Sequence, residues 1–244
     1  MHLMQPIRIQ DLYKAFGPVD VLNGVDLAFH PSETTAIVGP NGAGKTTLIK
    51  CILGLTHADT GSIDVAGRSI AEGVAYRNQI GYMPQHAHFP ENLTGRQMIA
   101  MVRSLRGSAE GDADIDLSLI RTLRLEADLD KPFRVLSGGT RQKISALLAF
   151  MVHPPILILD EPTAGLDPIS SAALKDHIHQ RRAEGACVVL TSHVLADLEE
   201  LADRVVFLLD GLIRFDGELG ELRTLTGERR LERAIATLLE GEAA

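Results

Sequence analysis

The chain has 244 residues, 45% hydrophobic and 23% charged, which is typical of an ordinary globular protein with a sizeable core. Its formal net charge is −8, and this argues against broad binding to the phosphate backbone of DNA or RNA. Cys51 and Cys187 lie in apolar runs without the spacing of a metal site, so we expect small buried side chains in a reducing compartment.

The N-terminal third of the chain begins with two runs that alternate apolar and polar residues, at 7–14 and 21–29. Alternation of this kind predicts half-exposed strands, here antiparallel because a short turn around Gly17 separates them. Phe16 opens the turn after the first run, and as an aromatic residue it could either stack on a nucleotide base or belong to the core. No apolar run of the chain approaches the roughly 18 residues of a membrane span, so a function at the membrane would need another chain to cross it.

A glycine-rich segment follows the next apolar run and has the spacing of a phosphate-binding loop. The run at 35–38 predicts a buried strand, and residues 39–46 match the pattern G-x-x-x-x-G-K-[ST] before a predicted helix. Glycines let backbone N–H groups crowd around an anion, and the start of a helix favours negative charge. Lys45 would add a cation for the outer phosphates, and the Thr46 hydroxyl could bind Mg²⁺.

Short strands and amphipathic helices alternate through the middle of the chain. A strand is expected at 80–83 before Gln85, and helices at 94–105 and from Leu117 through Leu125, separated by an exposed loop at 107–116. His86 and His88 are interpreted as solvated loop residues, because a metal site would need more ligands nearby.

The next predicted helix opens with Ser137-Gly138-Gly139. Its apolar residues at 144, 147, 148 and 151 have the spacing of a helix with a buried stripe, and Ser137 is suited to cap it. Bare N–H groups and a hydroxyl at a helix start can form a second anion-binding nest, although many helices begin in a similar way.

Two more apolar runs end in residues that could carry chemistry. The strand expected at 156–160 ends in Asp160 and is followed by Glu161, at the sheet edge where α/β proteins place their sites. Asp160 could hold Mg²⁺ and Glu161 could orient or deprotonate water, the alternative being surface acids at a strand end. The strand expected at 186–191 leads to His193, which could reach a γ-phosphate from the same edge or be merely structural.

Taken together and in this order, the motifs resemble those of the ATP-binding subunit of an ABC transporter over essentially the whole chain. The matching segments are the Walker A loop at 39–46, the Q-loop glutamine Gln85, the signature at 136–140, the Walker B strand at 156–160 with Glu161 as catalytic glutamate, the D-loop at 164–167 and the switch histidine His193. Phe16 lies where this family has its base-stacking aromatic residue.

The resemblance implies an α/β fold: a P-loop NTPase core with a mixed, mainly parallel sheet, an N-terminal antiparallel β subdomain and an inserted α-helical subdomain. We expect the core and the β subdomain at 1–86 and 154–218, the helical subdomain with the signature at 87–153, and a short helical C-terminal tail at 219–244.

The resemblance also implies the site residues and the cofactors, ATP and Mg²⁺. The residues implied in catalysis are Glu161, His193, Gln85 and Asp167, and those implied in binding Mg²⁺ are Thr46, Gln85 and Asp160. The residues implied in binding ATP are Phe16, Gly39, Pro40, Asn41, Gly42, Ala43, Gly44, Lys45, Thr46, Thr47, Ser137, Gly138 and Gly139. Thr140 stands where the family usually has Gln, which leaves the contact of that side chain in doubt.

In this family ATP lies between two domains that face each other head to tail, so Ser137, Gly138 and Gly139 would complete the site of a second copy. The resemblance therefore implies an ATP-dependent dimer, integral membrane permease subunits as partners, and a cytoplasmic location on the inner face of the cell membrane. The segments 136–143 and 191–200 look like those of exporter-type ATPases, a group that serves nitrous-oxide-reductase maturation and copper handling.

Two other functions compete with a transport motor. A soluble ABC-type ATPase acting on nucleic acid or ribosomes would resemble proteins with tandem domains, coiled-coil insertions or basic linkers, and none is visible in this compact acidic chain, so no nucleic acid is expected as partner. A nucleotide-binding scaffold that does not hydrolyse ATP would not need both Glu161 and His193.

Overall fold

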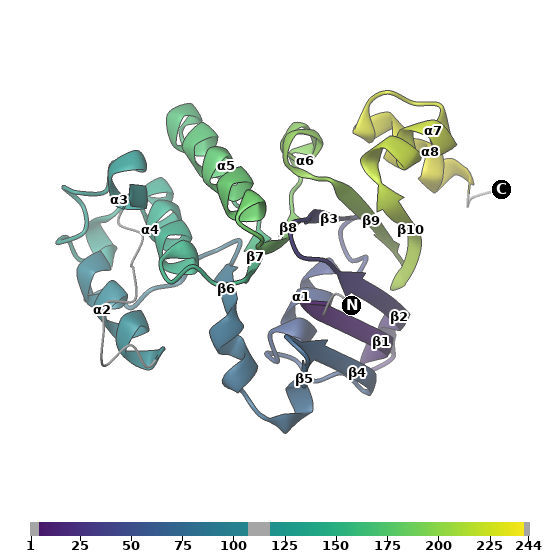
Figure 1. The fold of residues 1–244 in the computed structure, drawn as a ribbon, viewed down its shortest axis with the longest axis horizontal. Coiled ribbons are helices and arrows are strands. Elements are labelled where there is room, and N and C mark those ends of the chain that lie inside the picture. The colour runs from purple at the N-terminus through teal and green to yellow at the C-terminus, as the bar shows by residue number, and fades with distance from the viewer. Residues whose placement is uncertain (1–4, 107–117, 242–244) are drawn as a thin grey trace.

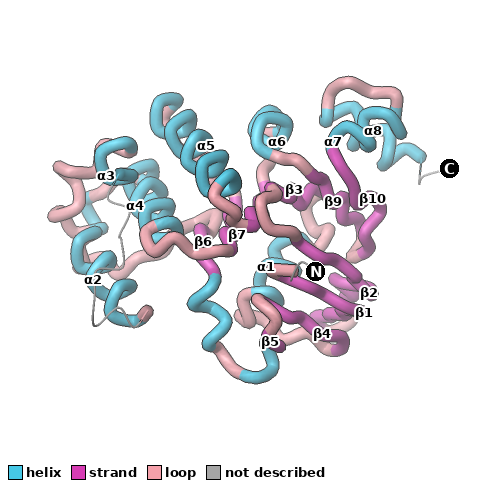
Figure 2. Tube along the Cα trace, viewed as in Figure 1, coloured by secondary structure: helices cyan, strands magenta, loops and turns pink. Residues whose placement is uncertain are grey.

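The structure is a computed structural model and describes residues 5–106 and 118–241. Two β-sheets pack on a helix that lies between them, and the remaining helices lie against the other face of the larger sheet (Figure 1). Figure 2 shows that strands dominate one side of the molecule, whereas the helices α2, α3 and α4 lie together on the opposite side.

The smaller sheet is antiparallel and has the strand order β2-β1-β4-β5. Its strands are β1 (Ile7–Phe16), β2 (Val19–Phe29), β4 (Thr60–Val65) and β5 (Arg68–Ser69). Ile7, Ile9 and Leu12 of β1 are buried, as the alternating pattern predicts, and the turn between β1 and β2 contains Gly17.

The larger sheet has the order β10-β9-β3-β8-β7-β6. Its strands are β3 (Thr34–Val38), β6 (Ile80–Met83), β7 (Ile156–Asp160), β8 (Cys187–Thr191), β9 (Arg204–Leu209) and β10 (Leu212–Glu218). The strands from β9 to β6 run parallel, and β10 pairs antiparallel with β9 through a hairpin. The carboxyl ends of β3, β8, β7 and β6 therefore lie at one edge, which is where an α/β fold places its ligands.

Strand β3 is buried on both faces. On one face, Ala36 and Val38 belong to an apolar cluster that includes side chains of the helices at 138–150, 168–183 and 195–201. On the other face, Ile37 belongs to a second cluster, which includes the helix at 45–52 and the smaller sheet. An uninterrupted apolar run is the natural sequence of a strand covered on both sides.

Both cysteines are buried, as expected, and burial raises the pKa of the Cys187 thiol to about 12.

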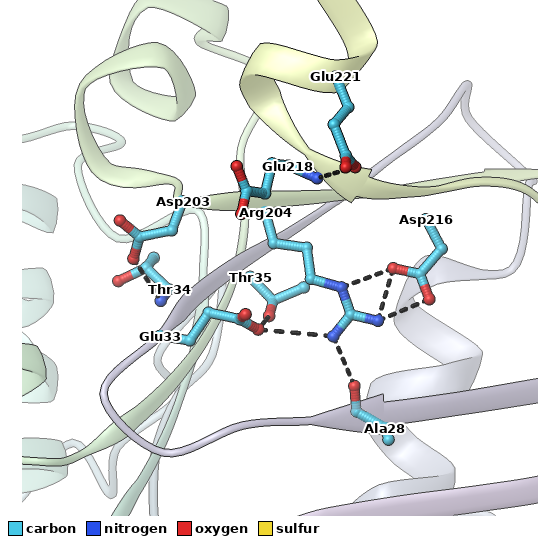
Figure 3. A network of polar contacts seen from close by, with 9 residues as sticks. All are labelled: Ala28, Glu33, Thr34, Thr35, Asp203, Arg204, Asp216, Glu218 and Glu221. Carbon is cyan, nitrogen blue, oxygen red and sulfur yellow. Dashed lines mark hydrogen bonds and ion pairs between the residues drawn. The ribbon is translucent and has the colours of Figure 1, made fainter.

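A polar network joins the N-terminal end of β3 to β2, β9 and β10 (Figure 3). Arg204 at the start of β9 donates two hydrogen bonds of 2.6 Å to Asp216 of β10 and one of 2.7 Å to the carbonyl oxygen of Ala28 in β2. The same guanidinium lies 3.5 Å from Glu33, whose carboxylate accepts a hydrogen bond of 2.9 Å from the Thr35 hydroxyl. The network joins both sheets at the base of the strand that leads into the glycine-rich loop.

The helices of the described residues are mostly those that the spacing predicts. They are α1 (Lys45–Ile52), α2 (Gly95–Leu105), α3 (Ser118–Thr122), α4 (Gly138–Phe150), α5 (Pro168–Ala183), α6 (Leu195–Leu201), α7 (Leu219–Thr226) and α8 (Leu231–Gly241). Short 3₁₀ turns occur at Ile70–Glu72, Ala75–Gln79 and Phe133–Val135. Within residues 5–106 and 118–241, no helix has the length and apolar character needed to cross a bilayer.

The helix expected to continue through Leu125 is shorter than predicted. Arg124 adopts a left-handed backbone conformation with φ of 56°, and the Leu125 N–H donates to the carbonyl oxygen of Ile120, which closes α3 as a C-cap motif. Leu123 and Leu125 are nevertheless buried, so the apolar pattern reports their packing correctly. Leu117 and the loop expected at 107–116 lie outside the described residues.

The division into a core, a helical subdomain at 87–153 and a tail stays a prediction. Met98 and Leu119 belong to the same apolar cluster as Leu157 and Leu159 of β7, so contacts between buried side chains continue from the helices onto the sheet. The tail comprises α7 and α8, separated by Gly227 with φ of 71°.

Candidate active site

The glycine-rich loop between β3 and α1 needs glycine for two separate reasons. A Cβ on Gly39 would lie 2.1 Å from the carbonyl oxygen of Leu208 in β9, and one on Gly44 would lie 2.7 Å from that of Val21 in β2. Gly42 has open space around it but a φ of 86°, which L-residues rarely adopt. The loop is thus pressed against both sheets and aims the start of α1 outward, as an anion cradle requires.

Lys45 is the first residue of α1, and its side chain lies along the loop. Its ammonium donates to the carbonyl oxygens of Gly39 at 2.6 Å and Pro40 at 2.9 Å. Burial lowers the pKa of Lys45, and the charges of Glu161 and Asp160 act in the opposite direction. These carboxylates therefore lie close enough to interact with the lysine electrostatically.

The other residues of the loop that we expected to bind ATP differ in exposure. Pro40, Asn41 and Gly42 form an exposed rim, while Ala43 is buried beneath them. Thr46 is exposed in the first turn of α1, and Thr47 is half-buried. The exposed rim and the exposed Thr46 hydroxyl are accessible to a ligand from solvent.

The two acids at the end of β7 are buried, so the alternative of surface acids at a strand end is wrong. Asp160 is 7% exposed and accepts a hydrogen bond of 2.5 Å from the Thr191 hydroxyl of β8. Glu161 is 5% exposed and has a φ of 54°, a conformation that costs energy for any residue other than glycine. Backbone of this kind persists where several neighbouring contacts hold it, and it is concentrated at functional sites.

His193 holds the Glu161 carboxylate from the end of β8. Its backbone N–H donates to Glu161 Oε2 at 3.0 Å, and its Nε2 lies 3.4 Å from Glu161 Oε1. The imidazole itself is 57% exposed, so it borders the site from the solvent side. The two residues, 32 apart in the chain, form one unit at the sheet edge.

The side chains of Gln85 and Phe16 are both exposed. Gln85 follows the end of β6, which pairs with β7, and its side chain is exposed. Phe16 is 52% exposed, with the Lys14 ammonium 5.1 Å from its ring centroid, so the alternative that it belongs to the core is wrong. His86 is exposed, and the described part of the chain holds no group of three or more His, Cys, Asp or Glu residues that could bind a metal ion.

The nest at the start of α4 is open to solvent. The Ser137 hydroxyl accepts a hydrogen bond of 3.1 Å from the N–H of Thr140, which confirms the predicted cap, and Ser137 and Gly138 are exposed. The contact of Thr140, left in doubt by the sequence, is also with Ser137, because the two hydroxyl oxygens lie 2.9 Å apart. A Cβ on Gly138 would meet nothing within 4 Å, so its outer side is free for an approaching group.

One face of α4 contacts the segment that follows Glu161, a relationship that sequence reasoning missed. A Cβ on Gly139 would lie 2.9 Å from the carbonyl oxygen of Gly165, and Gln142 Nε2 donates to the carbonyl oxygen of Glu161 at 3.5 Å. Lys143 lies 2.7 Å from Asp167, the N-cap of α5. Helical spacing places residues 139, 142 and 143 on one face of α4. Their partners lie at least 19 residues further along the chain, so the sequence around α4 does not identify them.

The residues present fit a nucleoside triphosphate and a hard divalent cation. The cradle provides backbone N–H groups, a helix start and an ammonium, which together favour phosphate groups. The carboxylate of Asp160 and the hydroxyl of Thr46 are oxygen donors of the kind that Mg²⁺ prefers. The arrangement can bind polyphosphate and hold a base, Glu161, at its edge.

Comparisons with known proteins identify the family of the chain. Residues 22–164 match the profile of the ABC transporter family. Daunorubicin resistance ATP-binding protein DrrA3 of Streptomyces coeruleorubidus is 34% identical over 93% of this chain and 72% of its own length. The ABC-type transporter ATP-binding protein EcsA of Bacillus subtilis (strain 168) is 32% identical over 92% of each chain.

Solved structures extend the likeness to three dimensions. A structure described as the ATP-binding subunit of an ABC transporter superposes with a TM-score of 0.90 at 32% identity, covering 96% of this chain and 99% of that one. A dimeric ATP-binding cassette bound to ADP and phosphate has a TM-score of 0.78 at 21% identity, covering 87% and 98%, and has the same fold.

The expected α/β fold, with its antiparallel sheet and its mostly parallel sheet, is confirmed. ATP binding and ATP hydrolysis follow from the family match together with the intact phosphate cradle. The chain belongs to the ABC transporter family and is an ATP-binding subunit with ATPase activity.

Proposed function

We propose that this chain is a motor subunit that uses ATP hydrolysis to drive a substrate through separate membrane subunits. The observation that carries the proposal is the position of Glu161. The residue is 5% exposed, and its carboxylate accepts a hydrogen bond of 3.0 Å from the His193 N–H and lies within electrostatic reach of Lys45. A buried carboxylate beside a phosphate cradle is suited to orient a water molecule and accept its proton.

Each part of the site has a distinct role in this proposal. The loop at 39–44 and Lys45 bind the phosphates, and Phe16 stacks on the base with its exposed ring. Thr46, Asp160 and Gln85 would hold Mg²⁺, and the ion would neutralise charge on the outer phosphates. His193 keeps the Glu161 carboxylate aimed at water while the bond to the γ-phosphoryl group breaks.

We further propose that two copies close head to tail around ATP, each offering Ser137, Gly138 and Gly139 to the other's nucleotide. The exposure of Ser137 and the open space beside Gly138 support this arrangement. Hydroxyl and N–H donors at a helix start stabilise charge that develops on a phosphoryl group. Asp167 follows Gly165, against which Gly139 packs, so it would lie beside this seam and assist catalysis there.

We propose an integral membrane permease as the other partner, which would place the chain on the inner face of the cell membrane. Support comes from a relative named as an ABC-type transporter ATP-binding protein and from a cavity of about 290 Å³ between the end of α1, β6 and α2. Leu53, Leu55, Tyr82 and Val102 line this cavity, and Leu55 is 60% exposed. An apolar helix of a permease would cover these side chains.

For the direction of transport we propose export. One relative, 32% identical over 84% of this chain and 68% of its own length, is named Nod factor export ATP-binding protein I, from Burkholderia lata. The narrower similarity to ATPases of nitrous-oxide-reductase maturation and copper handling depends on residues 136–143 and 191–200, and it stays a prediction. Identification of the membrane chain that copurifies from a detergent extract tests both the direction of transport and the narrower similarity.

The substitution Glu161→Gln tests the proposed role of the carboxylate. Removing the base while keeping its size should lower the rate of phosphate release by roughly 10²–10⁴-fold and should trap an ATP-bound dimer in gel filtration. Glu72→Gln, on an exposed 3₁₀ turn, is the matched control and should hydrolyse ATP normally. Wild-type turnover by Glu161→Gln would remove this residue from the role of base.

A further inference from the structure

A second contact joins the segment after Glu161 to the segment after His193. The Thr163 hydroxyl donates a hydrogen bond of 2.5 Å to Asp197 Oδ2, across 34 residues of sequence. Thr163 lies in the turn that follows Glu161, and Asp197 lies in the first turn of α6, which follows His193. Both residues are buried, at 9% and 8% exposure.

Asp197 is a buried charge with a defined partner. Its Oδ1 lies 2.6 Å from the ammonium of Lys175 in α5, and the same ammonium lies 2.7 Å from the exposed Glu200. Burial would lower the pKa of Lys175, but its hydrogen bonds to Asp197 and Glu200 outweigh burial and raise it. Lys175 is therefore charged and fixes Asp197 in place, leaving Oδ2 free to accept from Thr163.

The geometry of Glu161 explains why such a contact is needed. Its φ of 54° is unfavourable, and the backbone can return to an ordinary conformation unless the turn after it is held. The turn is held from one side by Gln142, through the carbonyl oxygen of Glu161, and from the other by Asp197, through Thr163. Neither contact includes an atom that would react with ATP.

We propose that Asp197 is a positioning residue, which acts through Thr163 to keep the Glu161 carboxylate in register with His193. The two segments are then joined at two points, by the Glu161–His193 pair at the site and by the buried Thr163–Asp197 pair behind it. The inference rests on the proposed function of Glu161, because it concerns how that residue is oriented. Small displacements of a catalytic group lower the rate of the chemical step without changing substrate binding.

The substitution Thr163→Val tests the proposal, since it removes the hydroxyl and keeps the shape of the side chain. We expect kcat per ATP-binding site, counted by calorimetry, to fall about 10- to 100-fold with the KM for ATP and the melting temperature close to wild type. Thr163→Ser keeps the hydroxyl and should restore the rate. Asp176→Asn, at an exposed position of α5 outside this network, is the control and should behave as wild type.

Three results would overturn the proposal. These are an unchanged kcat in Thr163→Val, a loss that Thr163→Ser does not restore, and a loss that accompanies equal losses of ATP binding and melting temperature. Asp197→Ala removes one of the two carboxylates that hold the half-buried ammonium of Lys175 and leaves a cavity beside it, so a loss of folding and a loss of positioning would be mixed in that variant, and the decision rests on the Thr163 variants. If Glu161→Gln is inactive while Thr163→Val is fully active, the positioning role fails and the proposed function stands; an active Glu161→Gln would instead undermine the proposed function.

Discussion

The ammonium of Lys143 lies 2.7 Å from the carboxylate of Asp167. The contact joins the helix that starts at the Ser137 nest to the cap of α5, just after the turn that carries Glu161. Asp167 also accepts hydrogen bonds of 2.9 Å and 2.7 Å from the backbone and the hydroxyl of Ser170. Within one chain, this contact therefore connects α4, which we propose completes the ATP site of a partner copy, to the turn after Glu161, which we propose belongs to the chain's own ATP site.

The Asp167 contacts predict a particular dependence of stability on pH. The hydrogen bond from Lys143, followed by those from Ser170, lowers the pKa of Asp167, so the folded chain favours its carboxylate. This stabilisation is complete above the pKa of an unfolded aspartate, about 3.9, and is lost as the pH falls from there through the lower pKa of the folded state. Asp167→Asn should lower the melting temperature at pH 7, and the difference from wild type should shrink at low pH.

Thermal melts of wild type and Asp167→Asn between pH 7 and pH 3 provide the measurement. Asp176→Asn, an exposed aspartate of the same helix, serves as the matched control. A difference between wild type and Asp167→Asn that stays constant over this range would contradict the assigned charge interaction.

Lys45 should be required for tight binding of ATP. Lys45→Ala removes the cation of the cradle, and we expect the affinity measured by calorimetry to fall by about 100-fold, a typical loss for a charge-assisted contact. Lys50→Ala changes an exposed lysine in the last turn of the same helix and should leave the affinity unchanged. Wild-type affinity in Lys45→Ala would contradict the assignment of the loop.

Adding a methyl group should impair folding at Gly39 but only ATP hydrolysis at Gly138. Gly39→Ala places a Cβ 2.1 Å from a backbone oxygen of β9, so it should lower the melting temperature and the yield of folded protein. Gly138→Ala meets nothing within 4 Å and should fold normally, yet it should slow phosphate release because the methyl group blocks the approach of a second copy. Normal turnover by Gly138→Ala would argue against a shared site at α4.

The contact between Thr140 and Ser137 should matter for hydrolysis but not for the first binding of nucleotide. Thr140→Val removes the hydroxyl that lies 2.9 Å from the Ser137 oxygen, leaving the Ser137 side chain less well oriented. We expect phosphate release to slow several-fold, and Ser137→Ala to slow it more, with the affinity of the monomer for ATP unchanged in both. Thr140→Ser is the control that keeps the hydroxyl. A matching loss of monomer affinity would place the nest on the chain's own nucleotide.

Contiguous motifs could be read from the sequence because backbone geometry dictates them locally. Gly39, Gly42 and Gly44 mark a turn that only glycine tolerates, and Ser137 marks a helix start by its capping chemistry. The predicted helix through Leu125 was too long because Arg124 adopts a left-handed conformation that its residue type does not announce. The spacing of apolar residues reports burial, and burial continues beyond the end of that helix.

The sequence by itself determined which chemical groups this protein has and the order in which they occur, down to the two acids at the end of β7 and the histidine after β8. Only the tertiary structure decided that Glu161 is buried in a strained conformation, that Phe16 is exposed, and that Asp197 reaches Thr163. The reason is physical. A motif within a few residues is specified by local backbone and side-chain preferences, whereas a contact across 34 residues depends on how helices and strands pack together.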